Sequence, residues 1–387
     1  MSDETLASTV ERVTATMLEL LGKPSVSGQE EVARAYVRER LEALGLQPQT
    51  DAAGNLMARV AATPSERDGE APLLLNAHLD RVPPGLAHTP RIEDGVMRSD
   101  GTTNLGADDA AGVAIILATV EALRARGLSH PPLLLLFTVG EEVGLTGAKA
   151  FDPAPWGARE GIVFDNAGEA GVVVTRAATY IAFDVAISGS GGHPGKRLEG
   201  AVSAIEIFHR AQYPWGSLDD DTTRISIGRI EGGAARNAVP RELHALGEIR
   251  TLADASGRAA LMERVAGSFT EAARALGGRA EVTFDPHCAC YTVADDEPLL
   301  LAWRGAVEAR GGTYRTMTTF IGSDASALRE HARVFTISTG VMDEHTVDEW
   351  VPLAPLAELA ETTVALLASY TSADAEAQST PATTHAC

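Results

Sequence analysis

The sequence predicts an α/β protein, in which a doubly wound, mostly parallel sheet is interrupted by an inserted α+β domain. Short apolar runs alternate with helical patterns in residues 1–178 and again in residues 292–370, as strands and helices do in a doubly wound sheet. Residues 179–291 instead contain strands that alternate apolar and polar side chains, which is typical of half-exposed strands. At 387 residues the chain is also long for a single domain.

The first part of the chain predicts two amphipathic helices, three buried strands and a helix between the first two strands. The amphipathic helices are expected at residues 5–21 and 29–44, and Ser27 with Glu30 forms a capping-box pattern before the second. The strands are expected in PLLLNAH, PPLLLLFTVGEE and GIVFDN. The intervening helix is expected to present one apolar face, formed by Val113, Ile116, Leu117, Val120 and Leu123.

The inserted segment predicts the order βαββαβ, which is the ferredoxin-like arrangement of an α+β domain. Its strands are expected in YIAFDVAIS, TRISIGRI, ELHALGEIRTL and AEVTFDP, with helices at about 200–212 and 255–276. We therefore expect a discontinuous domain, residues 1–178 and 292–370, that carries residues 179–291 as an insertion.

The composition narrows the class of function. A formal charge of −21 argues against nucleic acid or an anionic membrane surface as a partner and favours a site that holds cations. The acidic start MSDETLASTVERV predicts no secretory signal, and no apolar run approaches the ~18 residues of a membrane span. The three cysteines form no disulfide framework, so we expect a cytoplasmic protein. The small polar residues of 371–387 predict a disordered tail.

Polar side chains that can bind a metal follow four of the predicted apolar strands. They are His78 and Asp80, Glu141 and Glu142, Asp165 and, after a further strand expected in RVFTIST and a short loop, His345. Ligands of open α/β sheets bind at the carboxyl ends of the strands, so we expect these side chains at one edge. Each of them alone is explained by an ordinary polar turn. Carboxylates that gather in one cleft, however, repel each other unless a cation neutralises them.

Asp108, in NLGADDAAG, is a further candidate ligand, because it follows a glycine-rich turn that allows close backbone approach. The alternative is that Asp108 or Asp109 caps the helix that follows. Mixed histidine and carboxylate ligands suit zinc, manganese or cobalt rather than magnesium or calcium. Two metal ions ~3.5–4 Å apart that share a bridging carboxylate would use five ligands. We expect two divalent ions per subunit, with zinc favoured and manganese or cobalt as alternatives.

Seven motifs follow one another along nearly the whole chain: AHLDRVPPG, SDGTTNLGADDAAGVA, TVGEEVGLTGAKAF, GSGGHPG, ARNAVP, GSDASALRE and EHTVDEW. In this order they resemble the co-catalytic zinc exopeptidases, which include peptidase T, carboxypeptidase G, aminoacylase and the acetylornithine and succinyl-diaminopimelate deacylases. The chain is most similar to the peptidase T-like branch. Each motif alone is weak, but the combination is specific.

The resemblance implies a role for the residues at the strand ends. The implied metal ligands are Asp108 as the bridge, His78 and Asp165 on one ion, and Glu142 and His345 on the other. Glu141, adjacent to a ligand but not itself one, would be the general base, since a free carboxylate can take a proton from the attacking water and pass it to the leaving amine. Asp80 would hydrogen-bond the second ring nitrogen of His78 and fix its tautomer. The family also has a cis peptide after its bridging aspartate, here Asp108–Asp109.

The resemblance further implies that the inserted domain is a lid and a homodimer interface that contributes to substrate binding. His193, in GSGGHPG, and Asn237, in RNAVP, would reach the substrate, often in the neighbouring subunit's site. Arg250 would clamp a substrate carboxylate, and Gly322 and Ser323 would donate hydrogen bonds to it. Ordinary interpretations stay open for these residues: a loop histidine in a glycine turn, a strand-end arginine, and a Gly-Ser turn that leads into a helix.

Two other motifs carry less information. The segment HCAC, with His287, Cys288 and Cys290, lacks a fourth ligand and the C-x₂-C spacing of a zinc site, so we expect a strand of the inserted domain. The segment GSGGHP departs from G-x-G-x-x-G at its last position, so it does not support dinucleotide binding.

The sequence therefore predicts a two-metal aminopeptidase that acts on short peptides, most like a tripeptidase. An N-acyl amino acid deacylase or carboxypeptidase is the alternative, because it would use the same hydrolytic residues. A non-catalytic metal-binding protein with this fold is a third hypothesis, which the presence of Glu141 and all five ligands disfavours. A related aminopeptidase family with a β-barrel lid is a rival at the level of the fold, and the order βαββαβ counts against it.

Overall fold

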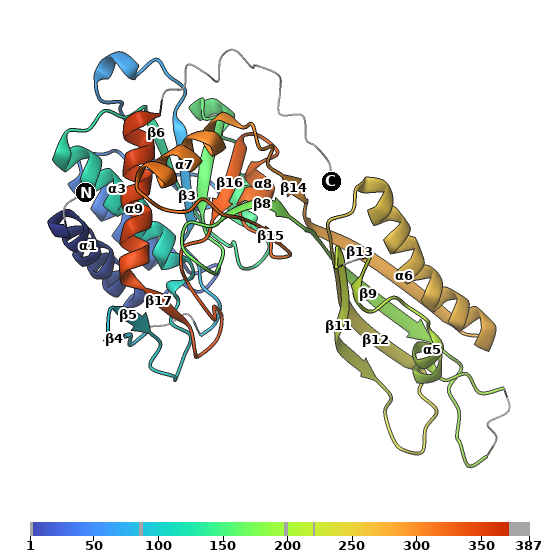
Figure 1. Cartoon of the computed structure of the whole chain (residues 1–387). Coiled ribbons are helices and arrows are strands. Elements are labelled where there is room, and N and C mark those ends of the chain that lie inside the picture. Colours follow the sequence, from blue (N-terminus) through green and yellow to red (C-terminus); the bar gives the residue numbers. More distant parts are fainter. Residues whose placement is uncertain (1–2, 85–87, 197–199, 220, 371–387) are drawn as a thin grey trace. The chain divides into compact units, whose positions relative to one another are not determined.

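A computed structural model describes residues 3–84, 88–196, 200–219 and 221–370 (Figure 1). The described chain divides into two compact units. The first unit contains residues 3–176, 293–318 and 323–370, and the second contains residues 177–292 and 319–322. The predicted disordered tail, residues 371–387, lies outside the described residues.

The first unit is built on a mixed sheet whose central strands are parallel. The parallel strands, in spatial order, are β6 (Leu133–Thr138), β3 (Leu73–His78), β7 (Glu160–Phe164) and β16 (Arg333–Ile337). Antiparallel strands flank them: β2 (Leu56–Val60) and β1 (Gln49–Thr50) beyond β6, and β8 (Val173–Ala177) beyond β16. Every residue of β3 and β6 is buried, which explains why apolar residues dominate both strands. The predicted mostly parallel α/β sheet is confirmed.

Three helices of the first unit pack against one another: α1 (Asp3–Leu21), α3 (Ala107–Arg126) and α9 (Leu353–Ser369) (Figure 1). Helix α3 also contacts β3 and β7. All residues from 109 to 120 are buried, so α3 is enclosed around its whole circumference and not along one apolar face as predicted. The other helices of this unit are α2 (Glu31–Ala43), α4 (Thr146–Ala150), α7 (Pro298–Ala309) and α8 (Ala325–Leu328).

Glu361 joins these three packed helices through its carboxylate. This side chain lies on α9, is 2% exposed, and accepts hydrogen bonds from Thr9 Oγ1 of α1 at 2.6 Å and from Arg126 Nη1 of α3 at 2.8 Å. Burial raises the pKa of Glu361, but the hydrogen bonds from Arg126 and Thr9 outweigh burial and hold this pKa below its usual value. The ionised carboxylate therefore stabilises the folded state.

Glu361→Gln is expected to lower the free energy of unfolding by ~1–3 kcal/mol at pH 7, because an amide cannot neutralise Arg126. A carboxyl group with a depressed pKa in the folded state stabilises it above the unfolded-state pKa of ~4.3, and this contribution disappears as the pH falls through the folded-state value. Urea unfolding of both proteins at pH 7 and at lower pH should show the difference shrinking with acidity. An equal difference at every pH would contradict this account of Glu361.

The capping box predicted for α2 is wrong. Helix α2 begins at Glu31, and Glu30 precedes it without a side-chain capping bond; its carboxylate instead accepts from the backbone N–H of Gly28 at 2.7 Å. The hydroxyl of Ser27 donates to Asp80 Oδ2 at 2.7 Å. Ser27 therefore supports the polar loop that follows β3 rather than the start of a helix.

A small antiparallel sheet in the first unit was not predicted. It consists of β17 (Trp350–Pro352), β5 (Val96–Arg98) and β4 (Arg91–Glu93), in that order. Strands of three residues are too short to show a period in the sequence. Because β17 begins five residues after His345, this sheet holds the chain on the carboxyl side of His345.

The second unit has the predicted ferredoxin-like order, with one extra edge strand. Its antiparallel strands, in spatial order, are β10 (Gly216–Leu218), β11 (Thr223–Gly232), β12 (Glu242–Thr251), β9 (Thr179–Ser188) and β13 (Arg279–Cys288). Its helices are α5 (Ala204–Arg210) and α6 (Ala255–Leu276), which contact each other. Helix α5 begins later than predicted because Ser203 caps it, accepting from the N–H of Glu206. The strand β10 was not predicted.

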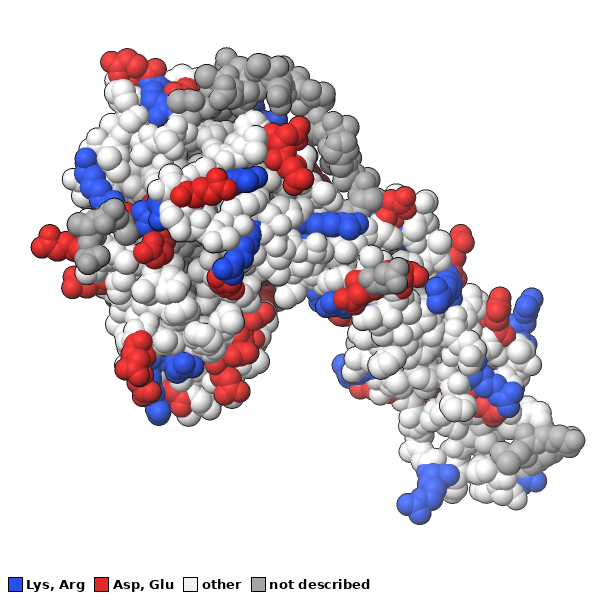
Figure 2. Space-filling view, in the orientation of Figure 1, with Lys and Arg blue, Asp and Glu red and all other residues white. Residues whose placement is uncertain are grey.

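The surface agrees with the acidic composition. Acidic and basic side chains are interspersed over the face in Figure 2, and the described residues form no continuous basic patch on that face. In the described part of the chain, each helix is too short or too polar to cross a membrane.

Candidate metal centre

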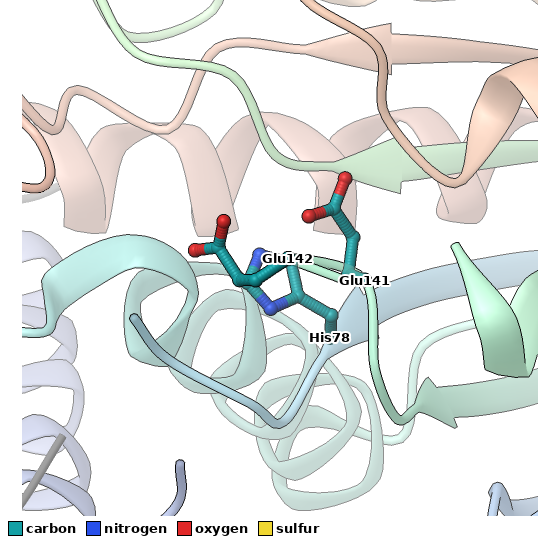
Figure 3. A group of neighbouring side chains, drawn as sticks. All are labelled: His78, Glu141 and Glu142. Carbon is teal, nitrogen blue, oxygen red and sulfur yellow. The ribbon is translucent and has the colours of Figure 1, made fainter. Parts of the chain in front are cut away.

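The carboxyl ends of the parallel strands bring the predicted polar side chains together in the first unit. His78 is the last residue of β3 and pairs in register with Thr138, the last residue of β6. Glu141 and Glu142 lie in the turn after β6, and Asp165 directly follows β7. Figure 3 shows His78 together with the two glutamates, whose carboxyl groups point in different directions.

Asp108 joins this group from the start of α3. The backbone at Asp108 and Asp109 is not helical, and the peptide bond between them is cis, as the family resemblance implied. Gly106 precedes them with a φ of 73°, and a Cβ atom there would lie 2.7 Å from Arg81 Cδ. Only glycine fits this position, so the glycine-rich turn sets the path of the backbone into Asp108.

The potential ligands form two triads that share Asp108. In each triad the ligand atoms lie within 4.8 Å of one another; one consists of His78, Asp108 and Asp165, and the other of Asp108, Glu142 and His345. The Asp108 carboxylate contacts His78 Nε2 through Oδ1 and His345 Nε2 through Oδ2, both at 3.2 Å. Nε2 of His345 is also 2.9 Å from Glu142 Oε1. A further triad combines His78 with Glu141 and Glu142.

The carboxyl groups of this cluster disfavour one another's ionisation. Burial, together with the charge of Asp108, raises the pKa of Asp165 to about 7. Burial, together with the charge of Asp165, raises the pKa of Glu141 well above its usual value. The pKa of Asp108 is instead low, because hydrogen bonds from His345 and His78 outweigh its burial. The cluster is a concentration of negative charge that needs cations.

The imidazoles of His78 and His345 supply positive charge at the positions where metal ions would bind. Hydrogen bonds to Asp108 and Glu142 raise the pKa of His345 to about 10. Burial lowers the pKa of His78, but its hydrogen bonds to Asp108 and Asp80 outweigh burial and raise it. Because metal ligands must be deprotonated, divalent cations would take the place of these protons. The donor set of two imidazoles and three carboxylates, with one shared carboxylate, therefore fits two divalent ions.

Asp80 lies against the second ring nitrogen of His78, as expected, and also supports the turn after β6. Its carboxylate is fully buried and accepts from the backbone N–H groups of Glu141 at 2.9 Å and Glu142 at 3.1 Å. His78 Nδ1 lies 2.9 Å from the main-chain oxygen of Asp80, whereas its carboxylate oxygen is 3.6 Å away. The main-chain carbonyl is thus the closer partner of the ring, and the carboxylate mainly holds the turn that carries the two glutamates.

Two further buried carboxylates support the ligands: Asp109, which the sequence suggested only as a possible helix cap, and Glu349, which was missed. Asp109 is 1% exposed and accepts from the backbone N–H of His78 at 3.2 Å and of Gly112 at 2.8 Å. Glu349 is 1% exposed and accepts from backbone N–H groups at the start of α3. Glu349 lies in the motif EHTVDEW, four residues after His345, and this proximity was the one available signal.

The second unit places two predicted substrate-binding residues on neighbouring loops. His193 is exposed, and its Nδ1 accepts from the backbone N–H of Gly195 at 3.1 Å. Gly192, next to it, accepts from the N–H of Val239 at 2.9 Å, two residues after the exposed Asn237. The loops that carry His193 and Asn237 are therefore paired.

Arg250 is held near the segment that ends in Gly322. Its Nη1 donates to the main-chain oxygen of Phe320 at 2.8 Å, its Nε donates to Glu248 at 3.0 Å, and its guanidinium lies 4.5 Å from the centre of the Tyr180 ring. In the first unit, the buried Ser323 hydroxyl is hydrogen-bonded to Thr336 at 2.8 Å.

The HCAC segment begins in a strand, as predicted. His287 and Cys288 end β13, and the His287 ring packs on Tyr180 with 4.8 Å between ring centres. Among the described residues, the groups able to hold a metal ion include none from this segment.

Comparison with known proteins identifies the family. The model of peptidase family M20/M25/M40 matches residues 74–369. The chain is 32% identical over 367 residues to the uncharacterized protein YqjE of Bacillus subtilis, a match that covers 92% of this chain and 97% of that protein.

Two crystal structures are similar over nearly the whole chain. Aminopeptidase PepT from Bacillus cereus superposes with a TM-score of 0.86 at 31% identity, and a tripeptidase from Staphylococcus aureus with a TM-score of 0.88 at 29% identity. Each match covers 93% of this chain and 98% of the other. The chain therefore belongs to peptidase family M20/M25/M40, in its peptidase T-like branch, and is a metal-dependent exopeptidase.

Proposed function

We propose that this protein is a two-metal aminopeptidase that removes the N-terminal residue of short peptides, with tripeptides as its preferred substrates. The observation that carries the proposal is the pair of ligand triads that share Asp108. The similarity to an aminopeptidase and to a tripeptidase over 93% of the chain supports the choice of substrate.

The five ligands divide between two metal positions. His78, Asp108 and Asp165 would hold one divalent ion, and Asp108, Glu142 and His345 would hold the other. Zinc is the metal that we propose, with manganese or cobalt as alternatives that the same ligands accept. When bound, such ions lower the pKa of water and polarise the peptide carbonyl.

Glu141 would be the general base. Its side chain lies in the same turn as the ligand Glu142, and burial raises its pKa, which makes its carboxylate a stronger base than an exposed one. The carboxylate would accept a proton from the attacking water and return it to the amine nitrogen of the leaving product. Asp80 would position Glu141 by holding its backbone N–H.

One assay tests the proposed substrate class. Metal-loaded protein is given tripeptides with a free amine, dipeptides, and N-acetyl amino acids at equal concentration, and kcat/KM is compared. Preference for the tripeptides supports the proposal. Preference for N-acetyl amino acids would instead make the protein a deacylase, and release of the C-terminal residue would make it a carboxypeptidase.

The second unit would contribute substrate contacts in a homodimer. A ferredoxin-like unit has a sheet edge that can pair across a two-fold axis. His193 and Asn237 are exposed on paired loops and would reach the substrate, in the partner subunit's site. Arg250 would bind the substrate carboxylate, and Gly322 and Ser323 would donate hydrogen bonds to the same carboxylate. Because Glu248 and Phe320 already hold the Arg250 side chain, it would be preorganised for binding.

His193→Ala is expected to lower kcat by ~10²–10³-fold, because the imidazole would donate a hydrogen bond to the oxyanion of the tetrahedral intermediate. Metal content and melting temperature should stay unchanged, since His193 is exposed and distant in sequence from the ligands. His209, which is also on the second unit, serves as the matched control, and His209→Ala should retain full activity. Full activity of His193→Ala would remove its catalytic role.

Subunit mixing tests whether His193 acts across the dimer. Mixing His193→Ala with Glu141→Gln should partly restore activity, because some heterodimers then carry one intact composite site. No recovery after verified subunit exchange would place His193 in its own subunit's site.

A further inference from the structure

Three consecutive backbone N–H groups converge on the carboxylate of Glu349. Gly106 donates to Oε2 at 2.9 Å, and Ala107 and Asp108 donate to Oε1 at 2.8 and 3.2 Å. Glu349 is 1% exposed, so solvent does not compete for these bonds. Both carboxylate oxygens are thus used to hold the backbone that leads into Asp108.

Glu349 belongs to the loop that presents His345. This loop is closed by two hydrogen bonds between Met342 and Trp350, at 2.9 and 3.0 Å. The main chain of Glu349 is fixed as well, because its N–H donates to Thr346 at 3.3 Å and its oxygen accepts from Ser99 at 3.0 Å. One side chain therefore connects the loop of His345 to the turn of Asp108, although 241 residues separate Glu349 from Asp108.

Glu349 accepts from N–H groups that a regular helix leaves without an internal partner. The first N–H groups of a helix have no partner within the helix, and the non-helical backbone at Asp108 breaks the regular pattern further. Arg81, fully buried and hydrogen-bonded to the main-chain oxygens of Leu20 and Lys23, places a positive charge near Glu349. Burial raises the pKa of Glu349 to about 7, and its three backbone N–H donors act against this rise.

We propose that Glu349 is a positioning residue of the metal centre, which fixes the Asp108 carboxylate between His78 and His345. This inference rests on the proposed metal centre but not on the proposed substrate. Asp108 is the ligand shared by both triads, so a small rotation of its backbone would disturb both metal positions at once. Groups that orient metal ligands typically contribute ~10–100-fold to metal affinity.

Glu349→Gln tests the inference, because the amide keeps the size of the side chain and one acceptor oxygen but turns an NH₂ group towards a backbone N–H. We expect the affinity for zinc, measured by competition with a chromophoric chelator, to fall ~10–100-fold. We also expect the visible spectrum of the cobalt-loaded variant to change, because it reports the geometry of the ligands. At saturating metal, kcat should fall more than KM rises.

Glu361→Gln is the matched control. It also replaces a buried glutamate that has several donors, but its partner Arg126 ends α3, roughly 25 Å along the helix from Asp108. This control is expected to lose stability while it keeps wild-type zinc affinity and the wild-type cobalt spectrum. A loss of stability alone therefore cannot imitate the expected result.

The outcomes separate this inference from the proposed function. If the wild-type protein binds no zinc, the metal centre itself is wrong; if it binds zinc and Glu349→Gln binds it equally well, only the positioning role is overturned. Should Glu349→Gln not fold, Glu349→Asp keeps a carboxyl group at this position but shortens its reach, and weaker zinc binding is again expected. Wild-type affinity in that variant, or failure of both variants to fold, would equally overturn the positioning role.

Discussion

Glu141→Gln is expected to lower kcat by ~10²–10⁴-fold, the usual contribution of a general base, while metal content and fold are retained. The amide is nearly isosteric with the carboxylate but cannot accept a proton. Steady-state kinetics with a tripeptide, together with metal analysis of the same sample, measures both quantities. The adjacent Glu142→Gln is the informative comparison, because it should lose metal as well as activity. Near-normal kcat in Glu141→Gln would exclude Glu141 as the base.

Removal of the metals is expected to abolish hydrolysis, and analysis of the intact protein should find close to two transition-metal ions per chain. Because Asp108 is shared by both triads, substitutions of different ligands should remove different numbers of ions. Asp108→Ala should lose both ions, because both triads contain Asp108, whereas His345→Ala should keep the ion held by His78 and Asp165.

Metal titration of the two variants, followed by mass spectrometry under native conditions, measures the stoichiometry directly. Retention of one tightly bound ion in Asp108→Ala would show that the carboxylate is not a bridge. Turnover by protein that contains no metal would reject the two-metal reaction altogether.

The sequence predicted the fold and the ligand-bearing positions because these depend on local patterns. Strands that are buried on both faces, such as β3 and β6, appear as short runs rich in apolar residues, and the polar residues that end each run mark its carboxyl end. His78 and Asp165 were found in this way. The structure places them with Asp108 in one triad of potential ligands.

The supporting contacts could not be predicted, because they join residues that are far apart in the sequence. Ser27 and Glu30 have the spacing of a capping box, yet the Asp80 carboxylate, 53 residues away, takes the Ser27 hydroxyl. Glu349 binds the N–H of Gly106 across 243 residues. No period or spacing encodes which backbone donor a buried carboxylate will reach.

The division of the chain into units has a consequence for exchanging parts between relatives. Within the described residues, the chain passes from one unit to the other four times, at 176/177, 292/293, 318/319 and 322/323. The short excursion, residues 319–322, provides the carbonyl of Phe320 for Arg250, and Gly322 leaves room for Cys288 Sγ, which would lie 3.0 Å from an added Cβ. In a chimera that takes only residues 177–292 from another protein, the residue at position 250 and its neighbours would come from that protein. Residues 319–322, which contact Arg250 here, would remain those of this chain. Transfer of the complete second unit between relatives therefore requires two segments, residues 177–292 and residues 319–322.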